Sequence, residues 1–280
     1  MAEPTRIAHP GPVAPARIAW TPCRAVSRDL TLPAGIPLVE AMAIATGGAP
    51  AWIDLSGVTA ERLAFVRPAP APGDGYAAWY SDVTVLDRAR IRAAGALLGR
   101  EGAAPFAHVH GLWTEDGGRE EMGHLLPGET VLACPAEVPA LLLLGAHPER
   151  LADDETGFSL FHPVGGAPGD AVLATIRPNE DLHVAVSKVA REAGLDRARV
   201  FGLGSLVGAV FEDGTGIEAY ATEVLLTGGT VGPEGADLAA EAIGFDGGRG
   251  AGRLARGQAV VCVTFECLLV SDQLSGRSDP

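Results

Sequence analysis

The sequence predicts an α+β protein made of two tandem copies of a small domain, each with a central antiparallel sheet flanked by helices. Composition is the first observation behind this class. Glycine (37 residues) and proline (21) together exceed a fifth of the 280 residues, which is too much for a helical bundle and typical of turn-rich sheets. Hydrophobic residues make up 47% and aromatic residues 5%, so the core is expected to consist mainly of Val, Leu and Ala. The other two observations are an internal repeat and an order in which a helix precedes several strands.

Four short segments recur along the chain in the same order. "HPGPVAPAR" resembles "HPVGGAPGD", "TLPAGIPL" resembles "TIRPNEDL", "GYAAWYSDV" resembles "GIEAYATEV", and "GHLLPGETV" resembles "GRLARGQAV", with offsets between 129 and 153 residues. Four matches in one order predict a duplication. We therefore expect one domain over residues 1–152 and a second over residues 153–280, joined near 147–158, where charge rises and the apolar periodicity stops.

The elements of the second copy are the easier ones to read. Asn179 can cap a helix whose apolar side chains fall on one face, and Gly194 ends that helix. After it, the segments 198–211, 217–229 and 257–270 have the composition of strands separated by Gly-rich turns.

The first copy follows the same order less clearly. Residues 36–48 are expected to form the equivalent helix. The period of residues 89–99 allows a helix or a strand, but their place in the repeat favours a strand. A helix followed by hairpin-linked strands gives an antiparallel α+β domain.

The charge of the chain restricts its partners. Acidic residues outnumber basic ones 35 to 21, for a formal charge of −14, and this field repels phosphate backbones and anionic membranes. The N-terminus lacks the apolar stretch of a signal peptide, and the longest apolar run, "VPALLLLGA", is too short to span a bilayer. The four cysteines show no CxxC spacing. We expect a cytoplasmic protein with reduced thiols and no membrane partner.

Histidines are concentrated in residues 108–124, "HVHGLWTEDGGREEMGH", which hold three of the seven in the chain. On a strand, His108 and His110 share one face. A loop centred on Gly117 would put His110 directly opposite His124, where cross-strand Cβ atoms lie about 4.5–5.5 Å apart. Three imidazoles within reach of one ion predict a divalent metal site, with zinc as the expected metal.

The histidines could also be ordinary polar residues, and the predicted site depends on the length of the loop. A single strand histidine is ordinarily just a polar residue, and an HxH pair alone says little. A loop one residue shorter would put His110 and His124 out of phase, so the predicted site depends on this register.

Three residues are candidates for binding a small molecule, and no catalytic residue is predicted. Trp113 either walls a pocket beside the histidines or packs in the core. Glu121 is one of four acids around the hairpin, each a possible general base or fourth ligand, or simply solvated. Arg253 either reaches an anionic substrate across an interface or is an ordinary surface arginine.

The order of helix, GxGS-like corner, "HVH", "DGG" and "GHLLPGE" resembles the plants-and-prokaryotes-conserved (PPC) domain, over nearly the whole chain as two copies. The resemblance implies a compact α+β domain that assembles as trimers and a metal bound by His108, His110 and His124. The second copy has Ala240, Ala242 and Arg253 where the histidines are expected, so it is predicted to bind no metal. The sequence contains no RGRP-type segment like that of the plant relatives, which argues against a nucleic-acid partner.

These observations favour a metal-dependent enzyme of hydrolytic or lyase type that acts on a small molecule. The alternative is a non-catalytic metal- or ligand-binding module with a regulatory or structural role. DNA binding is a third possibility, which rests on analogy alone. A homo-oligomer, expected as a trimer, is predicted from the resemblance and from the apolar segment "AVVCVTFECLLV", which implies burial on both faces. One chain could also bury this segment between its two copies.

Overall fold

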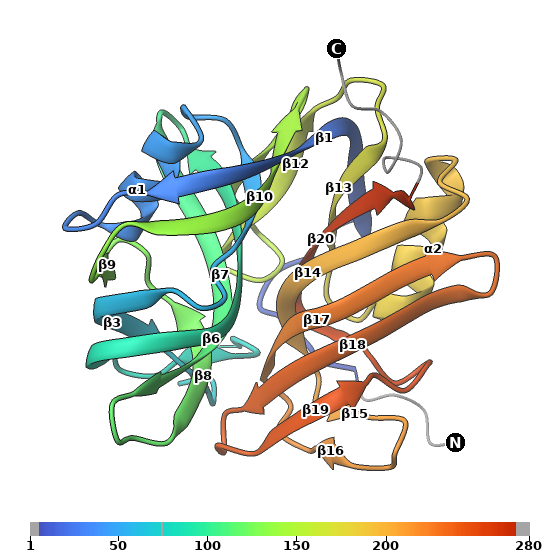
Figure 1. Ribbon diagram of the computed structural model, residues 1–280. Helices are drawn as coiled ribbons and strands as arrows, with labels where there is room; N and C mark the ends of the chain where they lie inside the picture. Colours follow the sequence, from blue (N-terminus) through green and yellow to red (C-terminus); the bar gives the residue numbers. More distant parts are fainter. Residues whose placement is uncertain (1–5, 74, 273–280) are drawn as a thin grey trace.

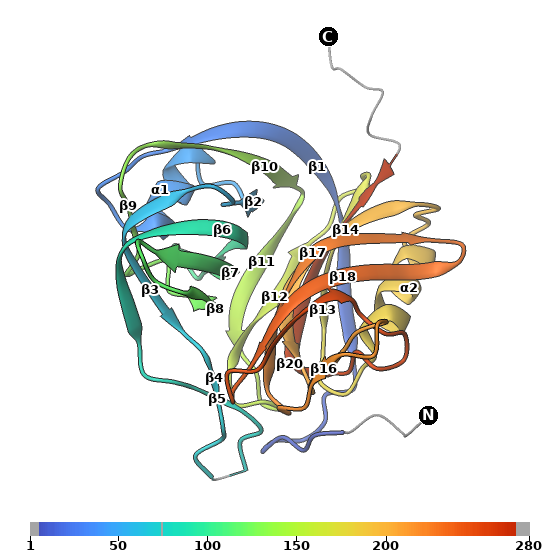
Figure 2. The same ribbon diagram turned by 60° about the horizontal axis from the view of Figure 1, so that its bottom comes forward.

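The computed structural model describes residues 6–73 and 75–272. Most of this chain forms one long, strongly curved antiparallel sheet, and a helix packs on each half (Figures 1 and 2). The helices are α1 (Leu38–Ala45) and α2 (Leu182–Glu192). In the first half the strands are β1 (Ile18–Leu32), β2 (Ala51–Asp54), β3 (Thr59–Val66), β4 (Pro68–Ala69), β5 (Trp79–Tyr80), β6 (Thr84–Glu101), β7 (Ala104–Glu115), β8 (Glu120–Leu125), β9 (Val131–Leu132), β10 (Ala136–Leu144) and β11 (Ala146–Ala152). In the second half they are β12 (Ser159–Gly165), β13 (Ala171–Ile176), β14 (Ala198–Leu206), β15 (Ala209–Val210), β16 (Gly216–Ile217), β17 (Thr222–Gly232), β18 (Gly235–Gly244), β19 (Arg249–Arg253) and β20 (Val261–Ser271).

The predicted α+β class is wrong. Within the described residues the fold is mostly antiparallel strand, with two helices of 8 and 11 residues that cannot flank a sheet of this length. Helical periodicity is confined to one short segment in each half. The Gly-rich connections elsewhere close hairpins, so the chain returns as a strand each time.

Individual element predictions fare better. Residues 36–48 contain α1 and residues 89–99 lie in β6, so both are confirmed. Gly194, with φ +72°, follows α2 as predicted. The N-cap is Asp181, whose side chain accepts a hydrogen bond from Val184 N, and not Asn179.

Strand β1 belongs to both halves of the sheet. Its residues Ile18–Cys23 pair with β13, and its residues Arg24–Leu32 pair with β10. From this strand the order is β1-β10-β2-β6-β7-β8 in one direction and β13-β20-β14-β17-β18-β19 in the other. The boundary predicted between residues 152 and 153 coincides with the end of β11, where the turn to β12 begins.

Three large apolar cores and one small cluster around Ala78, Ala221 and Cys262 hold the described residues together. One lies under α1, a second lies under α2, and a third lies between the halves, where Leu97, Leu112, Leu225 and Ile243 are buried. Burial of such side chains is the main favourable term in folding. The third core borders the site described below. No helix in the described residues has the length and apolar character needed to cross a membrane.

Candidate functional site

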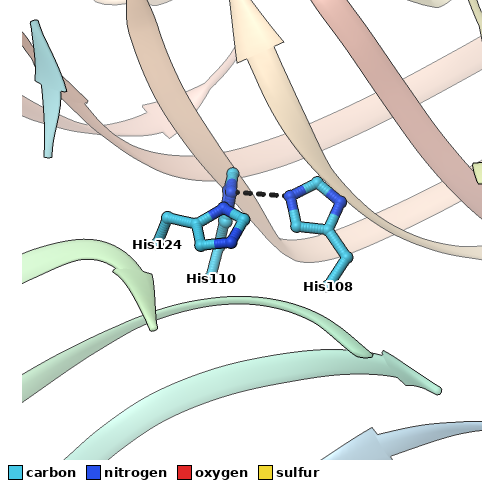
Figure 3. A group of neighbouring side chains, drawn as sticks. All are labelled: His108, His110 and His124. Atoms are coloured by element: carbon cyan, nitrogen blue, oxygen red, sulfur yellow. Dashed lines mark hydrogen bonds between the residues drawn. The ribbon is translucent and has the colours of Figure 1, made fainter. Parts of the chain in front are cut away.

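The hairpin of β7 and β8 has the register predicted from the sequence. His110 lies directly opposite His124, and the turn is centred on Gly117, which has φ +77°. Because alternate strand residues point to the same side, His108 joins the other two on one face. Figure 3 shows the three rings projecting from this hairpin toward the strands of the second half.

The three imidazoles are close enough to share one ion. His108 Nε2 and His110 Nε2 are 3.0 Å apart, and one ligand nitrogen from each of the three residues lies within 4.8 Å of the others. The ring centroids are 4.6 Å apart for His108 and His110, 4.9 Å for His108 and His124, and 5.3 Å for His110 and His124.

Hydrogen bonds on the far side of two rings determine which nitrogen carries the proton. His110 Nδ1 is 3.0 Å from the carbonyl oxygen of Val224, which can only accept, so Nδ1 donates and Nε2 keeps its lone pair. His108 Nδ1 donates in the same way to Glu266 Oε2 at 3.0 Å. Two Nε2 lone pairs therefore face each other, an arrangement that is favourable only with a cation or a shared proton between them.

The surroundings of His110 and His124 favour the neutral form of these two rings. Burial, followed by the charge of His108, lowers the pKa of both His110 and His124 well below the usual histidine value. Neutral imidazole is the ligand form. His124 Nδ1 is buried without a hydrogen-bond partner. A divalent transition metal fits this arrangement for three reasons. One buried ring nitrogen has no partner, two other ring nitrogens face each other, and two of the rings are oriented by a carboxylate or a carbonyl oxygen.

A cavity of about 300 Å³ opens onto the histidines between the two halves of the chain. Aromatic side chains form one part of its wall. Arg150 also lines the cavity and forms an ion pair with Glu101 at 2.6 Å. The aromatic residues of the wall are Trp79, Tyr80, Phe106, Phe158 and Phe161.

Two carboxylates at this cavity, Glu223 and Glu266, were missed by the sequence analysis. Both come from the second half, on β17 and β20, and both are buried. Glu223 Oε2 lies 3.6 Å from His110 Nε2 and has no hydrogen-bond partner. Burial raises the pKa of Glu223 to about 8. Each is an acid inside an otherwise apolar strand, "ATEVLL" and "VTFECLLV", and that is the signal that could have identified them.

The three predicted substrate-binding residues lie away from the cavity. Trp113 is fully buried under α1, with its ring edge-on to Phe65 at 4.9 Å, because it stands an odd number of residues from His110 and so faces the opposite side of the sheet. Glu121 is its cross-strand partner on that same side and pairs with Arg67 at 2.8 Å.

Arg253 is on the surface in an ion pair with Asp237. Its cross-strand partner is Ala239, whereas Ala240 and Ala242 point into the core under α2. The three residues therefore do not take the places of the three histidines. Neighbouring strand residues point to opposite faces, so Ala240 and Ala242 do not share a face with Arg253 as the three histidines share one.

No family model and no curated protein sequence matches the chain. Solved structures give partial matches at low identity. A metal-containing protein from Archaeoglobus fulgidus is 21% identical, with a TM-score of 0.41, and the match covers 50% of this chain and 96% of that one. A PPC protein from Pyrococcus horikoshii is 18% identical, with a TM-score of 0.39, over 51% of this chain and 95% of that one. A putative DNA-binding protein from Ralstonia eutropha is 12% identical, with a TM-score of 0.38, over 52% of this chain and 96% of that one. Over about half its length, then, the chain has structural neighbours that include a PPC protein and a metal-containing protein.

Proposed function

We propose that this protein binds a divalent metal ion, with zinc as the expected metal, through His108, His110 and His124. We further propose that it is a metal-dependent enzyme of hydrolytic or lyase type that acts on a small molecule. The observation that carries the proposal is the convergence of three imidazoles at the end of a cavity. Two of them present lone pairs 3.0 Å apart.

The cavity favours catalysis over a purely structural metal. A structural zinc site is sealed by its protein ligands, whereas a catalytic site borders a space that substrate can enter, and zinc can expand from four ligands to five during catalysis. Here the space beside the rings is about 300 Å³, enough for a small molecule. A zinc ion in this place supplies a Lewis acid that polarises a carbonyl or ester oxygen.

The chain's own residues supply the positioning. Glu266 and the Val224 carbonyl fix the His108 and His110 rings through their Nδ1 atoms. The aromatic wall limits water around a bound molecule and strengthens each polar contact made there. A non-catalytic metal-binding module is the second candidate, and turnover of no small molecule by the metal-loaded protein would favour it.

We also propose that the chain is a tandem PPC protein, divided at 1–152 and 153–280. Two features support this: the "HVH…DGG…GHLLPGE" hairpin and the strand order, which is the same from β1 to β8 as from β13 to β19.

Elemental analysis of the purified protein tests the metal. We expect about one equivalent of a divalent transition metal per chain in the wild type and loss of that metal in a His110→Ala, His124→Ala double variant. The matched control is His147→Ala, because His147 pairs with Glu149 away from the cluster. Equal metal content in the wild type and the double variant would refute the proposal.

A further inference from the structure

We propose that the second half of the chain completes the metal centre, with Glu223 as a direct fourth ligand and Glu266 as the residue that positions His108. This inference rests on the proposed metal site. In this inference the second half contributes to the metal site through β17 and β20, and not through its hairpin β18–β19.

Glu223 has the position and the free atom that a ligand needs. Its Oε2 is 3.6 Å from His110 Nε2. Ligands bound at about 2.0–2.1 Å around a tetrahedral ion are roughly 3.3 Å from one another, so this separation is close to that of two ligands of one ion. The side chain is 5% exposed, and Oε2 has no hydrogen-bond partner.

A purely structural role does not account for this carboxylate. A buried polar atom without a partner destabilises a fold, and it does so more strongly when it is charged. Packing would be served as well by an apolar residue such as those that follow it in "EVLL". An ion between Glu223 and the three rings would satisfy the orphaned oxygen, the orphaned His124 nitrogen and the facing lone pairs together.

The charges of the site also match a divalent ion. Glu266 is 1% exposed, with Oε2 on His108 Nδ1 and Oε1 accepting from Thr264 Oγ1. Among the described residues, the ion pairs of Glu223 and Glu266 are made with histidines alone. A buried acid without a lysine or arginine partner is ionised only when another positive charge lies beside it, and a bound cation would supply that charge. A dipositive ion between neutral histidines meets that need.

The fold brings these residues together from distant parts of the sequence. β17 carries Glu223 and lies against β6 and β7, and β20 carries Glu266 two strands away, beyond β14. Each acid thus reaches the first-half histidines across the boundary between the halves. In Figures 1 and 2 this boundary is where the green strands approach the orange and red ones.

The test is Co²⁺ binding by the metal-free full-length protein, measured by competition with a chromophoric chelator and by the visible spectrum of the bound ion. Three variants are compared with the wild type: Glu223→Gln, Glu266→Gln and the control Glu241→Gln. Glu241 is a neighbouring acid on β18 that pairs with Arg92 and does not line the cavity.

We expect Glu266→Gln to weaken Co²⁺ binding by about 10–100-fold with little change in the spectrum, because the ligand set is kept. Glu223→Gln should weaken it at least as much and change the spectrum, because a ligand is lost. Glu241→Gln should match the wild type. Thermal unfolding of the metal-free Glu223→Gln protein separates a ligand from a structural residue: its Tm should equal or exceed that of the wild type.

Two results would overturn the inference. Wild-type affinity and spectrum in Glu223→Gln would remove Glu223 from the ligand set while leaving the histidine site intact. The residue would be assigned to the fold if Glu223→Gln lowered the Tm of the metal-free protein and left the spectrum of the Co²⁺-loaded protein unchanged. Failure of the wild type to bind Co²⁺ or Zn²⁺ at all would contradict the proposed function itself.

Discussion

At the scale of single residues, the site depends on atoms whose bonding needs are unmet. Glu223 Oε2 and His124 Nδ1 are buried without partners, and two histidine lone pairs face each other. Most buried polar groups in folded proteins have a hydrogen-bond partner, so several unpartnered atoms gathered at one cavity require an explanation. The proposed function therefore rests on these buried atoms without hydrogen-bond partners as well as on the three histidines.

The raised pKa of Glu223 predicts how the stability of the metal-free protein changes with pH. A carboxyl group with a folded pKa of about 8 and an ordinary unfolded value of 4.5 stabilises the fold below pH 4.5 relative to higher pH. That contribution is lost as the pH rises toward 8. By pH 7 the loss attributable to this group is up to about 3 kcal/mol.

Urea unfolding of the metal-free wild type and Glu223→Gln proteins between pH 5 and pH 8 measures this effect. The difference in free energy of unfolding should move steadily in favour of the variant as the pH rises. A difference that stays constant over this range would show that Glu223 ionises normally.

The sequence analysis succeeded with the histidines and failed with the carboxylates for one physical reason. Hairpin register is local, since a turn at Gly117 and the two-residue period of a strand determine which side chains share a face. Glu223 and Glu266 reach the same site through strand order across the whole sheet, which no local pattern encodes. Of the two readings given for Trp113, the structure shows the packed one, because Trp113 stands three residues from His110 and faces the core under α1.

At the scale of elements, β8 holds His124 in place by packing closely on β3. Val66 pairs with His124, and a Cβ added at Gly123 would lie 2.4 Å from the Val66 carbonyl oxygen. The backbone of one strand must then move. The absence of a side chain at Gly123 therefore allows the close packing that positions His124, a proposed metal ligand.

Substitution of Gly123 by Ala is expected to destabilise the protein by about 1–3 kcal/mol and to weaken metal binding, because β8 and His124 shift together. Gly128→Ala is the matched control, since its added Cβ would meet no atom within 4 Å and its φ is not positive. Chemical denaturation and Co²⁺ titration of both variants measure the two effects. A Gly123→Ala protein with wild-type stability and affinity would contradict this account of the hairpin.

The error in fold class also belongs to this scale. Each half carries one short helix, and the prediction treated that helix as one of several in a layer. The Gly-rich segments that follow form hairpins, so the remaining chain adds strands to a single sheet. Composition had indicated turn-rich sheet, and this indication was closer to the structure than the α+β class.

At the scale of the whole molecule, the two halves share β1, a core and a cavity. Leu225, from the second half, is buried in the core between the halves along with Leu97 and Leu112 from the first. We expect Leu225→Ala to cost about 2–5 kcal/mol and to lower the Tm of a single transition that involves both halves. Calorimetry that resolved two independent transitions would contradict a shared core.

The oligomeric state stays a prediction. The apolar strand β20 is buried on both faces within the chain, by the core under α2 and the core between the halves, so it no longer requires a partner. The trimer rests on the PPC resemblance. Light scattering is expected to give three times the 28.7 kDa chain mass, and a monomer would remove that proposal without affecting the metal site.

The most direct test of the central claim is an anomalous difference map at the zinc absorption edge, from crystals of the protein purified without added chelator. We predict one strong peak per chain, about 2.0–2.1 Å from the Nε2 atoms of His108 and His110 and from a ring nitrogen of His124. A peak elsewhere in the chain, or no peak in crystals of protein that elemental analysis finds to contain zinc, would contradict the account.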